Sequence, residues 1–92
     1  MIEYDDAATE RLDFFDEHDV ALGAAFDRFF DRLEGDPSDL ALRRHYFRGE
    51  DVYLTEVPVA GRRDDFYYVA WQTLPDETIW VKAVHHRTSP LF

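Results

Sequence analysis

The sequence predicts an α+β fold in which a short N-terminal strand and an α-helical hairpin precede a three-stranded antiparallel meander. Two observations carry this prediction. In the first 35 residues, apolar side chains recur at i, i+4 and i+7, the period of one helical face. From Val52 onward the apolar residues are mostly aromatic or β-branched, and they form three runs separated by turns, which is typical of neighbouring antiparallel strands.

The expected N-terminal elements are one strand and two helices. Ile2 and Tyr4 alternate with polar neighbours and predict the strand. Ala8, Leu12 and Phe15 share one face of the first helix. Because few residues separate this face from the next apolar stripe, the two helices should pack as an antiparallel hairpin.

The second helix has clear signals at both ends. Asp19 is expected to be its N-cap. Gly35 is expected to end the helix as a C′ residue, and Pro37 prevents its continuation. One apolar stripe between these ends is expected to face the core: Leu22, Phe26, Phe29 and Leu33.

The second half is expected to begin with a connector, 37–48, that has room for one helical turn. The expected strands span 52–57, 66–73 and 78–85. Pro58 closes the first strand, and 60–65 is expected to be a polar loop. The sheet would pack one face on the helical hairpin and leave the other free for a partner.

Length and composition place residues 1–92 in one domain with a real core. The chain is 46% apolar and 16% aromatic, which is enough to avoid disorder. It has no cysteine, so disulfides and thiolate metal sites are excluded. Its start lacks the pattern of a signal peptide, and no apolar run approaches the roughly 20 residues of a membrane span. We therefore expect a cytoplasmic protein that does not bind membranes.

The charge of the chain is divided unevenly. Residues 1–41 carry thirteen acids and three arginines, a net of −10, whereas 42–92 carry seven acids and seven bases, a net of 0. The acidity disfavours free binding to nucleic acid, because phosphates would be repelled. Molar salt, in which the Debye length is roughly 3 Å, would weaken that repulsion. We expect one side of the molecule to function and the other to be a solvated surface.

Three segments stand out in their order along the chain. Residues 33–37 (LEGDP) end a helix before a proline, and 66–71 (FYYVAW) form an aromatic strand. Residues 79–87 (IWVKAVHHR) run from a strand into a His/Arg end, and the chain closes on Leu91-Phe92. In this order they resemble the RelE/ParE superfamily of toxins from type II toxin–antitoxin pairs. The resemblance spans nearly the whole chain and implies the βααβββ arrangement expected above.

The resemblance implies one of two activities. Members of the RelE type enter the ribosomal A site and cut messenger RNA by attack of a 2′-hydroxyl on the neighbouring phosphate. Members of the ParE type bind DNA gyrase, and an antitoxin that wraps the fold silences both types. The chain is therefore expected to be an mRNA interferase, an endoribonuclease whose partners are ribosome-bound mRNA and a cognate antitoxin. The alternative is a non-enzymatic binder, either gyrase-directed or an inactive homologue, and either would form a homodimer or a hetero-oligomer with the antitoxin.

His85, His86 and Arg87 are the candidate catalytic residues, mainly because of the resemblance. A histidine serves as acid or base near neutral pH, and an arginine offers a fixed charge for phosphate. Consecutive strand residues point to opposite faces, so one of the two histidines should face the open side together with Arg87. The alternative is that these residues are simply the polar end of a strand.

The other basic residues of the second half are candidate RNA- or partner-binding residues: Arg43, Arg44, His45, Arg48, Arg62 and Arg63. The first four form the densest basic cluster, and the resemblance places it near the path of the RNA. The alternative is a charged loop that balances Asp39 and Glu50. The last two are expected to pair locally with the adjacent Asp64 and Asp65.

Four aromatic residues could stack on bases, although at least half of them are expected in the core: Tyr67, Tyr68, Trp71 and Trp80. The chain also departs from the family pattern. It offers Leu54 and Glu56 where active members place Lys or Arg, and its terminal Phe92 lacks a hydroxyl. A site built on His45, His85 or His86 would compensate. No metal or cofactor is expected, because the histidines lack the spacing of zinc ligands.

Overall fold

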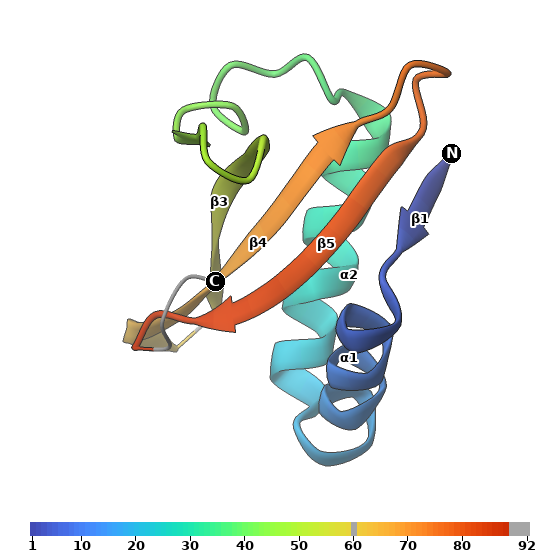
Figure 1. Ribbon diagram of the computed structural model, residues 1–92. Coiled ribbons are helices and arrows are strands. Elements are labelled where there is room, and N and C mark those ends of the chain that lie inside the picture. Colours follow the sequence, from blue (N-terminus) through green and yellow to red (C-terminus); the bar gives the residue numbers. More distant parts are fainter. Residues whose placement is uncertain (60, 89–92) are drawn as a thin grey trace.

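The computed structural model describes residues 1–59 and 61–88 (Figure 1). Its elements are β1 (Ile2–Tyr4), α1 (Asp6–His18), α2 (Val20–Gly35), β2 (Tyr46–Phe47), β3 (Val52–Val59), β4 (Arg62–Thr73) and β5 (Ile79–His86). The strands form one sheet of order β1-β5-β4-β3-β2. β3, β4 and β5 are the predicted antiparallel meander, and β1 adds to its edge parallel to β5. The predicted α+β fold is confirmed.

Both helices begin at an aspartate that caps the backbone. The carboxylate of Asp5 accepts a hydrogen bond from the Ala7 N–H at 3.0 Å, and that of Asp19 accepts one from the Leu22 N–H at 3.2 Å. Such caps satisfy N–H groups that have no partner inside the helix. Asp19 therefore has the predicted role, and it alone separates the two helices.

The end of α2 differs from the prediction. Gly35 is not a C′ residue but the last residue of the helix, and Asp36 is the C-cap. The Asp36 N–H donates to the Arg32 carbonyl at 3.0 Å, so the helical pattern continues through Gly35 without a left-handed residue. Pro37 has no N–H to continue that pattern, and it is the proline that stops the helix.

The helical hairpin packs on one face of the sheet (Figure 1). Phe26 lies at the centre of the contact, with its ring 5.7 Å from that of Phe15 and 5.7 Å from that of Tyr67. The stripe predicted from the sequence is buried, and the sheet meets it with Val57, Val69, Trp71, Ile79, Val81 and Val84. Within the described residues no helix is long and apolar enough to cross a membrane.

The strands differ from the prediction in the added β2 and in the bounds of β3, β4 and β5, the last of which lies one residue later than the predicted 78–85. The connector contains β2, a two-residue strand too short for any period to reveal. β3 continues through Pro58 to Val59, and β4 begins at Arg62, so the expected loop 60–65 is mostly strand. Pro58 is tolerated because β3 is an edge strand there. The Leu54 N–H points away from β4 and donates to the His45 carbonyl at 2.8 Å. The nitrogen of Pro58 points in the same direction as that of Leu54, away from β4. Its missing N–H therefore removes no hydrogen bond between β3 and β4.

The centre of the second sheet face is closed rather than free, which corrects the prediction. Val52 and Ala70 are fully buried there, and they pack with Leu54. Glu50, in the turn between β2 and β3, reaches over the sheet to the Lys82 ammonium at 2.5 Å. The register between β4 and β5 shifts after Ala70. Glu56, further along this face, is exposed.

Candidate functional site

Three ionisable side chains lie in one row across the outer face of the sheet. Glu56 on β3 pairs with Tyr68 on β4, and Tyr68 pairs with His85 on β5. Their neighbours Val57 and Val84 are buried toward the helices, so alternation turns the row outward. Neighbouring strands are about 4.8 Å apart, which separates the Glu56 and His85 backbones by about 10 Å.

His85 is partly buried at the end of β5. Burial, and next the positive charge of Arg11 on α1, lower the pKa of His85 from its ordinary value of 6.5. Both effects disfavour the charged imidazolium. The neutral form of His85 therefore dominates at pH 7.

The adjacent His86 points the other way, as the alternation predicts. Its ring lies edge-on to that of Tyr67 at 5.0 Å, on the helix side, and its Nδ1 is 2.7 Å from the Thr88 hydroxyl. Arg87 is exposed, and its N–H donates to the Phe66 carbonyl at 3.1 Å. The ladder thus extends one residue past β5 and places Arg87 on the same face as His85. The structure brings His85 and Arg87 to the row and removes His86 from it.

Arg43 has a structural role that the sequence did not reveal. Its guanidinium lies over the rings of Tyr53 and Trp71, at 5.0 and 5.7 Å from their centroids. It also donates to the Pro37 carbonyl at 2.6 Å and to the Tyr53 hydroxyl at 3.3 Å. These contacts hold the connector against the helix side of the sheet, so Arg43 is far less available for RNA than the prediction assumed.

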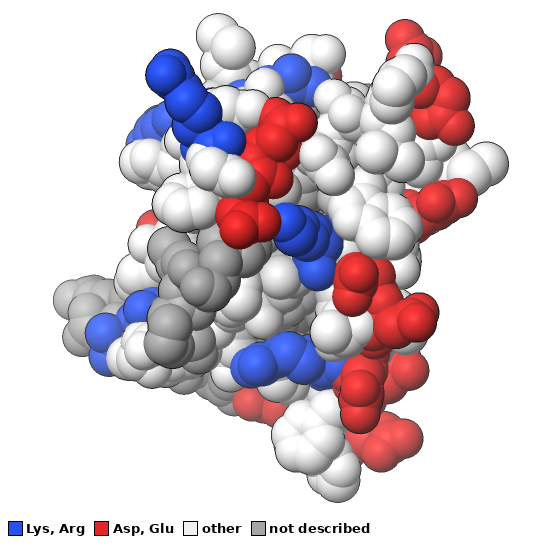
Figure 2. All heavy atoms as spheres, viewed as in Figure 1, with Lys and Arg blue, Asp and Glu red and all other residues white. Residues whose placement is uncertain are grey.

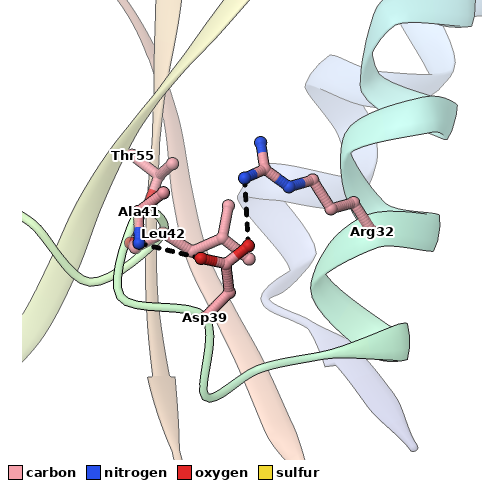
Figure 3. Close-up of polar contacts among 5 residues, drawn as sticks. All are labelled: Arg32, Asp39, Ala41, Leu42 and Thr55. Atoms are coloured by element: carbon pink, nitrogen blue, oxygen red, sulfur yellow. Dashed lines mark hydrogen bonds and ion pairs between the residues drawn. The ribbon is translucent and has the colours of Figure 1, made fainter.

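Two groups of hydrogen bonds hold the rest of the connector in place (Figure 3). Asp39 accepts from the Ala41 N–H at 2.9 Å and from Arg32 on α2 at 3.0 Å, and these two bonds, the backbone one first, lower the pKa of Asp39. On the other side, the buried Thr55 hydroxyl donates to the Leu42 carbonyl at 2.6 Å. The connector is therefore tied to α2 and to β3.

This anchoring places the next residues beside the row. Arg44 and His45 are exposed, and they line a shallow hollow of about 160 Å³ together with Arg32 and Glu56. The hollow joins the connector to the Glu56 end of the row. Arg48 is exposed in the turn after β2, away from this lining. Arg62 and Arg63 begin β4, and their side chains, with the ion pairs predicted for them, lie outside the described residues.

Charge is sorted over the surface in the same way as along the sequence. Figure 2 shows acidic side chains gathered along the side formed by α1 and β1, and lysine and arginine side chains over the connector and the sheet, with some acidic side chains among them. Since the row lies on the sheet, an anionic ligand would approach the site over the less acidic part of the molecule. The described residues contain no group of three or more His, Asp or Glu placed to hold a metal ion.

Sequence reasoning did not place Glu56 in this site, because Glu56 stood out only as a departure from the basic pattern of the family. It named Tyr68 among four aromatics that could stack on bases, without linking it to His85. Strand alternation could have placed each of these residues on one face of its own strand, but setting them opposite His85 requires the register between strands. Arg11 had no signal, because the packing of α1 on β5 brings it there. Of the four aromatics, Trp71 and Tyr67 belong to the core as expected.

Comparisons with protein families, with characterised proteins and with solved structures find no match to this chain.

Proposed function

We propose that the row of Glu56, Tyr68 and His85 cleaves RNA by transesterification. The observation that supports this is the register, which sets a carboxylate and an imidazole on opposite sides of one tyrosine on the face of the sheet turned away from the helices. A base and an acid on either side of a phosphate are the groups that this reaction needs.

In the proposed reaction, the Glu56 carboxylate takes the proton of a ribose 2′-hydroxyl. The 2′-oxygen forms a bond to the adjacent phosphorus while the bond to the 5′-oxygen breaks. Protonated His85 gives its proton to that leaving oxygen, and Arg87 stabilises the charge on the phosphate. The products are a 2′,3′-cyclic phosphate and a 5′-hydroxyl. Tyr68 would donate a hydrogen bond to the phosphate or stack on a base.

The biological role we propose is that of a toxin of the RelE type, acting in the cytoplasm on ribosome-bound mRNA and silenced by a cognate antitoxin. The element order and the His/Arg end of β5 support this proposal. An antitoxin would dock mainly on the sheet side, because an acidic partner is repelled by α1 and α2. A complex whose buried surface lies mostly between Glu10 and Glu34 would contradict this docking.

Expression in a bacterial host tests the proposal. Induction of the wild-type chain should arrest growth and create new RNA 5′ ends within translated frames. The variants Glu56→Gln and His85→Ala should lose both effects, whereas His18→Ala, an exposed histidine at the end of α1, should keep them. Absence of new ends with the wild-type chain, or their persistence in both site variants, would refute the proposal.

One observation favours a second candidate, a non-enzymatic binder such as a gyrase-directed toxin. Arg43 is engaged in the fold, and Glu50 pairs with Lys82 over the centre of the sheet, so these two cations are less available to RNA. This candidate predicts growth arrest without new RNA ends. It also predicts that Arg44→Ala reduces toxicity while Glu56→Gln leaves it unchanged.

A further inference from the structure

We propose that the hollow between β2, the start of β3 and the end of β4 binds a guanine base, with Tyr46 as the stacking ring and Asp51 as the hydrogen-bond acceptor. The hollow lies on the helix side of the sheet, whereas the row of Glu56, Tyr68 and His85 lies on the opposite face. The inference goes beyond the proposed function, because it requires that a base binds here and does not require that RNA is cut at the row.

Strand pairing brings the lining of the hollow together from three strands. Tyr46 on β2 pairs with Tyr53 on β3, and Tyr53 pairs with Trp71 on β4. Thr73 lies two residues after Trp71 and therefore on the same face of β4. A hollow of about 270 Å³ is lined by Tyr46, Asp51, Tyr53, Gln72 and Thr73. Sites for drug-sized ligands have volumes of roughly 300–1,000 Å³, so this hollow suits a ligand of the size of one base.

A series of aromatic rings leads from the core to the hollow. The buried Trp71 ring lies 4.9 Å from the Tyr53 ring, which lies 5.2 Å from the Tyr46 ring. The Arg43 guanidinium lies over the first two rings of this series, so it helps to fix them. Tyr46 is 50% exposed. It therefore presents ring surface to a ligand from a fixed position, and an unpaired base stacks on such a ring.

Asp51 supplies a hydrogen-bond acceptor beside the Tyr46 ring. It lies in the turn between β2 and β3 with a left-handed backbone conformation, φ 54°, and its carboxylate accepts a hydrogen bond from the Tyr46 hydroxyl. A carboxylate has about four acceptor positions, and the hydroxyl occupies one of them. Acceptor capacity therefore remains for a ligand that lies on the ring.

The groups that line the hollow favour guanine over other ligands. The Asp51 carboxylate would repel a phosphate. The Watson–Crick edge of guanine carries two neighbouring donors, N1–H and the N2 amino group, which match the two oxygens of a carboxylate. The same edges of adenine and uracil set an acceptor beside the donor, and the carboxylate would repel that acceptor. The Thr73 hydroxyl, which can donate, lines the same hollow and suits the O6 acceptor of guanine.

The test measures by NMR titration how tightly the whole protein binds GMP, AMP and ribose 5-phosphate. The variants are Tyr46→Ala, Asp51→Asn and Asp31→Asn. Asparagine tolerates the left-handed backbone of position 51, and Asp31 is an exposed acid on α2 whose variant loses the same charge elsewhere. The ratio of the dissociation constants of AMP and GMP cancels the general effect of removing one negative charge.

Wild type should bind GMP about tenfold more tightly than AMP, the effect of a hydrogen bond to a charged group. Asp51→Asn should bring this ratio close to one, and Asp31→Asn should leave it unchanged. Tyr46→Ala should weaken the binding of both nucleotides by about fivefold or more, because the stacking ring is lost. Equal binding of GMP and AMP by wild type, or unchanged binding by Tyr46→Ala, would overturn the proposal. Binding of ribose 5-phosphate as tight as that of GMP would also overturn it, because the phosphate alone would then be recognised.

Two further measurements separate the source of the base and the proposed function. A single-stranded RNA with methylated 2′-hydroxyls and one guanine among uracils should bind through Tyr46 as GMP does. Tighter binding of this RNA than of GMP would assign the site to RNA, and tighter binding of GMP would assign it to a free nucleotide. Glu56→Gln should bind GMP as wild type does. If the wild-type chain binds GMP in this way but cuts no RNA, the proposed function fails and this site stands.

Discussion

At the scale of single residues, the proposed chemistry depends on the protonation of His85. A general acid must carry its proton in the reactive state, and partial burial and Arg11 both lower the pKa of this group. In the proposed reaction, His85 would therefore work best on the acid side of neutrality.

The rate of cleavage should therefore depend on pH through His85. Measured as kcat/KM, which reports the free protein, it should fall as pH rises through the pKa of His85, below 6.5. The reason is that the acid loses its proton. Arg11→Gln should move this fall to higher pH, and His18→Ala should not. A rate that stays constant across this range would contradict the role of His85 as the acid.

The lowered pKa of His85 also makes the stability of the fold depend on pH. Above the unfolded-state value near 6.5 His85 is neutral in both states, and its contribution is constant. As pH falls below that value the unfolded chain takes up the proton first, so the free energy of unfolding decreases until the folded-state pKa is passed. Urea denaturation measures this decrease. Between neutral and acidic pH, the free energy of unfolding should decrease less in His85→Gln than in wild type. Identical pH profiles would contradict it.

Thr55 is the buried residue that ties the connector to β3. Its buried hydroxyl accepts a hydrogen bond from the Trp71 indole N–H at 2.9 Å and donates to the Leu42 carbonyl. Thr55→Val should lower the free energy of unfolding by about 1–3 kcal/mol, because both groups lose their partner in a buried place. Thr73→Val, at an exposed position on β4, is the matched control. Equal unfolding midpoints in urea for the two variants would show that the anchor is unimportant.

At the scale of elements, the sequence foretold what periodicity and capping control. Asp19 caps α2 and the apolar stripe of that helix is buried, because both depend on local residue order. The opposite directions of His85 and His86 follow from strand alternation in the same way. What could not be predicted depends on neighbours in space. β2 exists only because it pairs with β3, and Pro58 remains in β3 only because that edge is open.

The same division holds for the candidate site: local sequence order predicts part of it, and contacts between distant segments determine the rest. His85 and Arg87 could be placed from the end of one strand. The pairing of Glu56 with Tyr68 required the register between strands, which a single sequence does not encode locally. The engagement of Arg43 with Trp71 required knowledge of how the connector folds back.

The helical hairpin and the sheet share Phe26, whose exposure is 1%. Phe26→Ala should cost about 3–5 kcal/mol in the free energy of unfolding, because it empties the space between Phe15 and Tyr67. Leu40→Ala, at a position that is 83% exposed, should change stability by less than about 0.5 kcal/mol. Denaturation in urea separates the two. A cost below about 1 kcal/mol for Phe26→Ala would show that the core does not centre on this ring.

At the scale of the whole molecule, the separation of charge governs stability and approach. Asp13, Asp16 and Asp27 line one groove between α1 and α2. The pKa of Tyr4 nearby is raised by burial and by three carboxylates of α2, Glu34 first. This half of the molecule therefore carries a concentrated negative potential that salt screens.

The melting temperature should consequently rise from low to molar NaCl. Asp27→Asn should reduce that rise, because it removes one of the facing carboxylates of the groove. Glu77→Gln, which removes an exposed acid from the turn between β4 and β5, should reduce it less. A melting temperature that does not change with salt would contradict the idea that repulsion within the helical half destabilises the fold.

The most direct test of the central claim is to identify the ends of RNA cut by the purified protein in a reconstituted translation reaction. The account predicts a 2′,3′-cyclic phosphate and a 5′-hydroxyl at each cut. It also predicts that a 2′-deoxy sugar immediately 5′ of the cut, or the change Glu56→Gln or His85→Ala, abolishes cleavage. Intact RNA, or cleavage that leaves a 3′-hydroxyl, would contradict attack by the 2′-oxygen at this row.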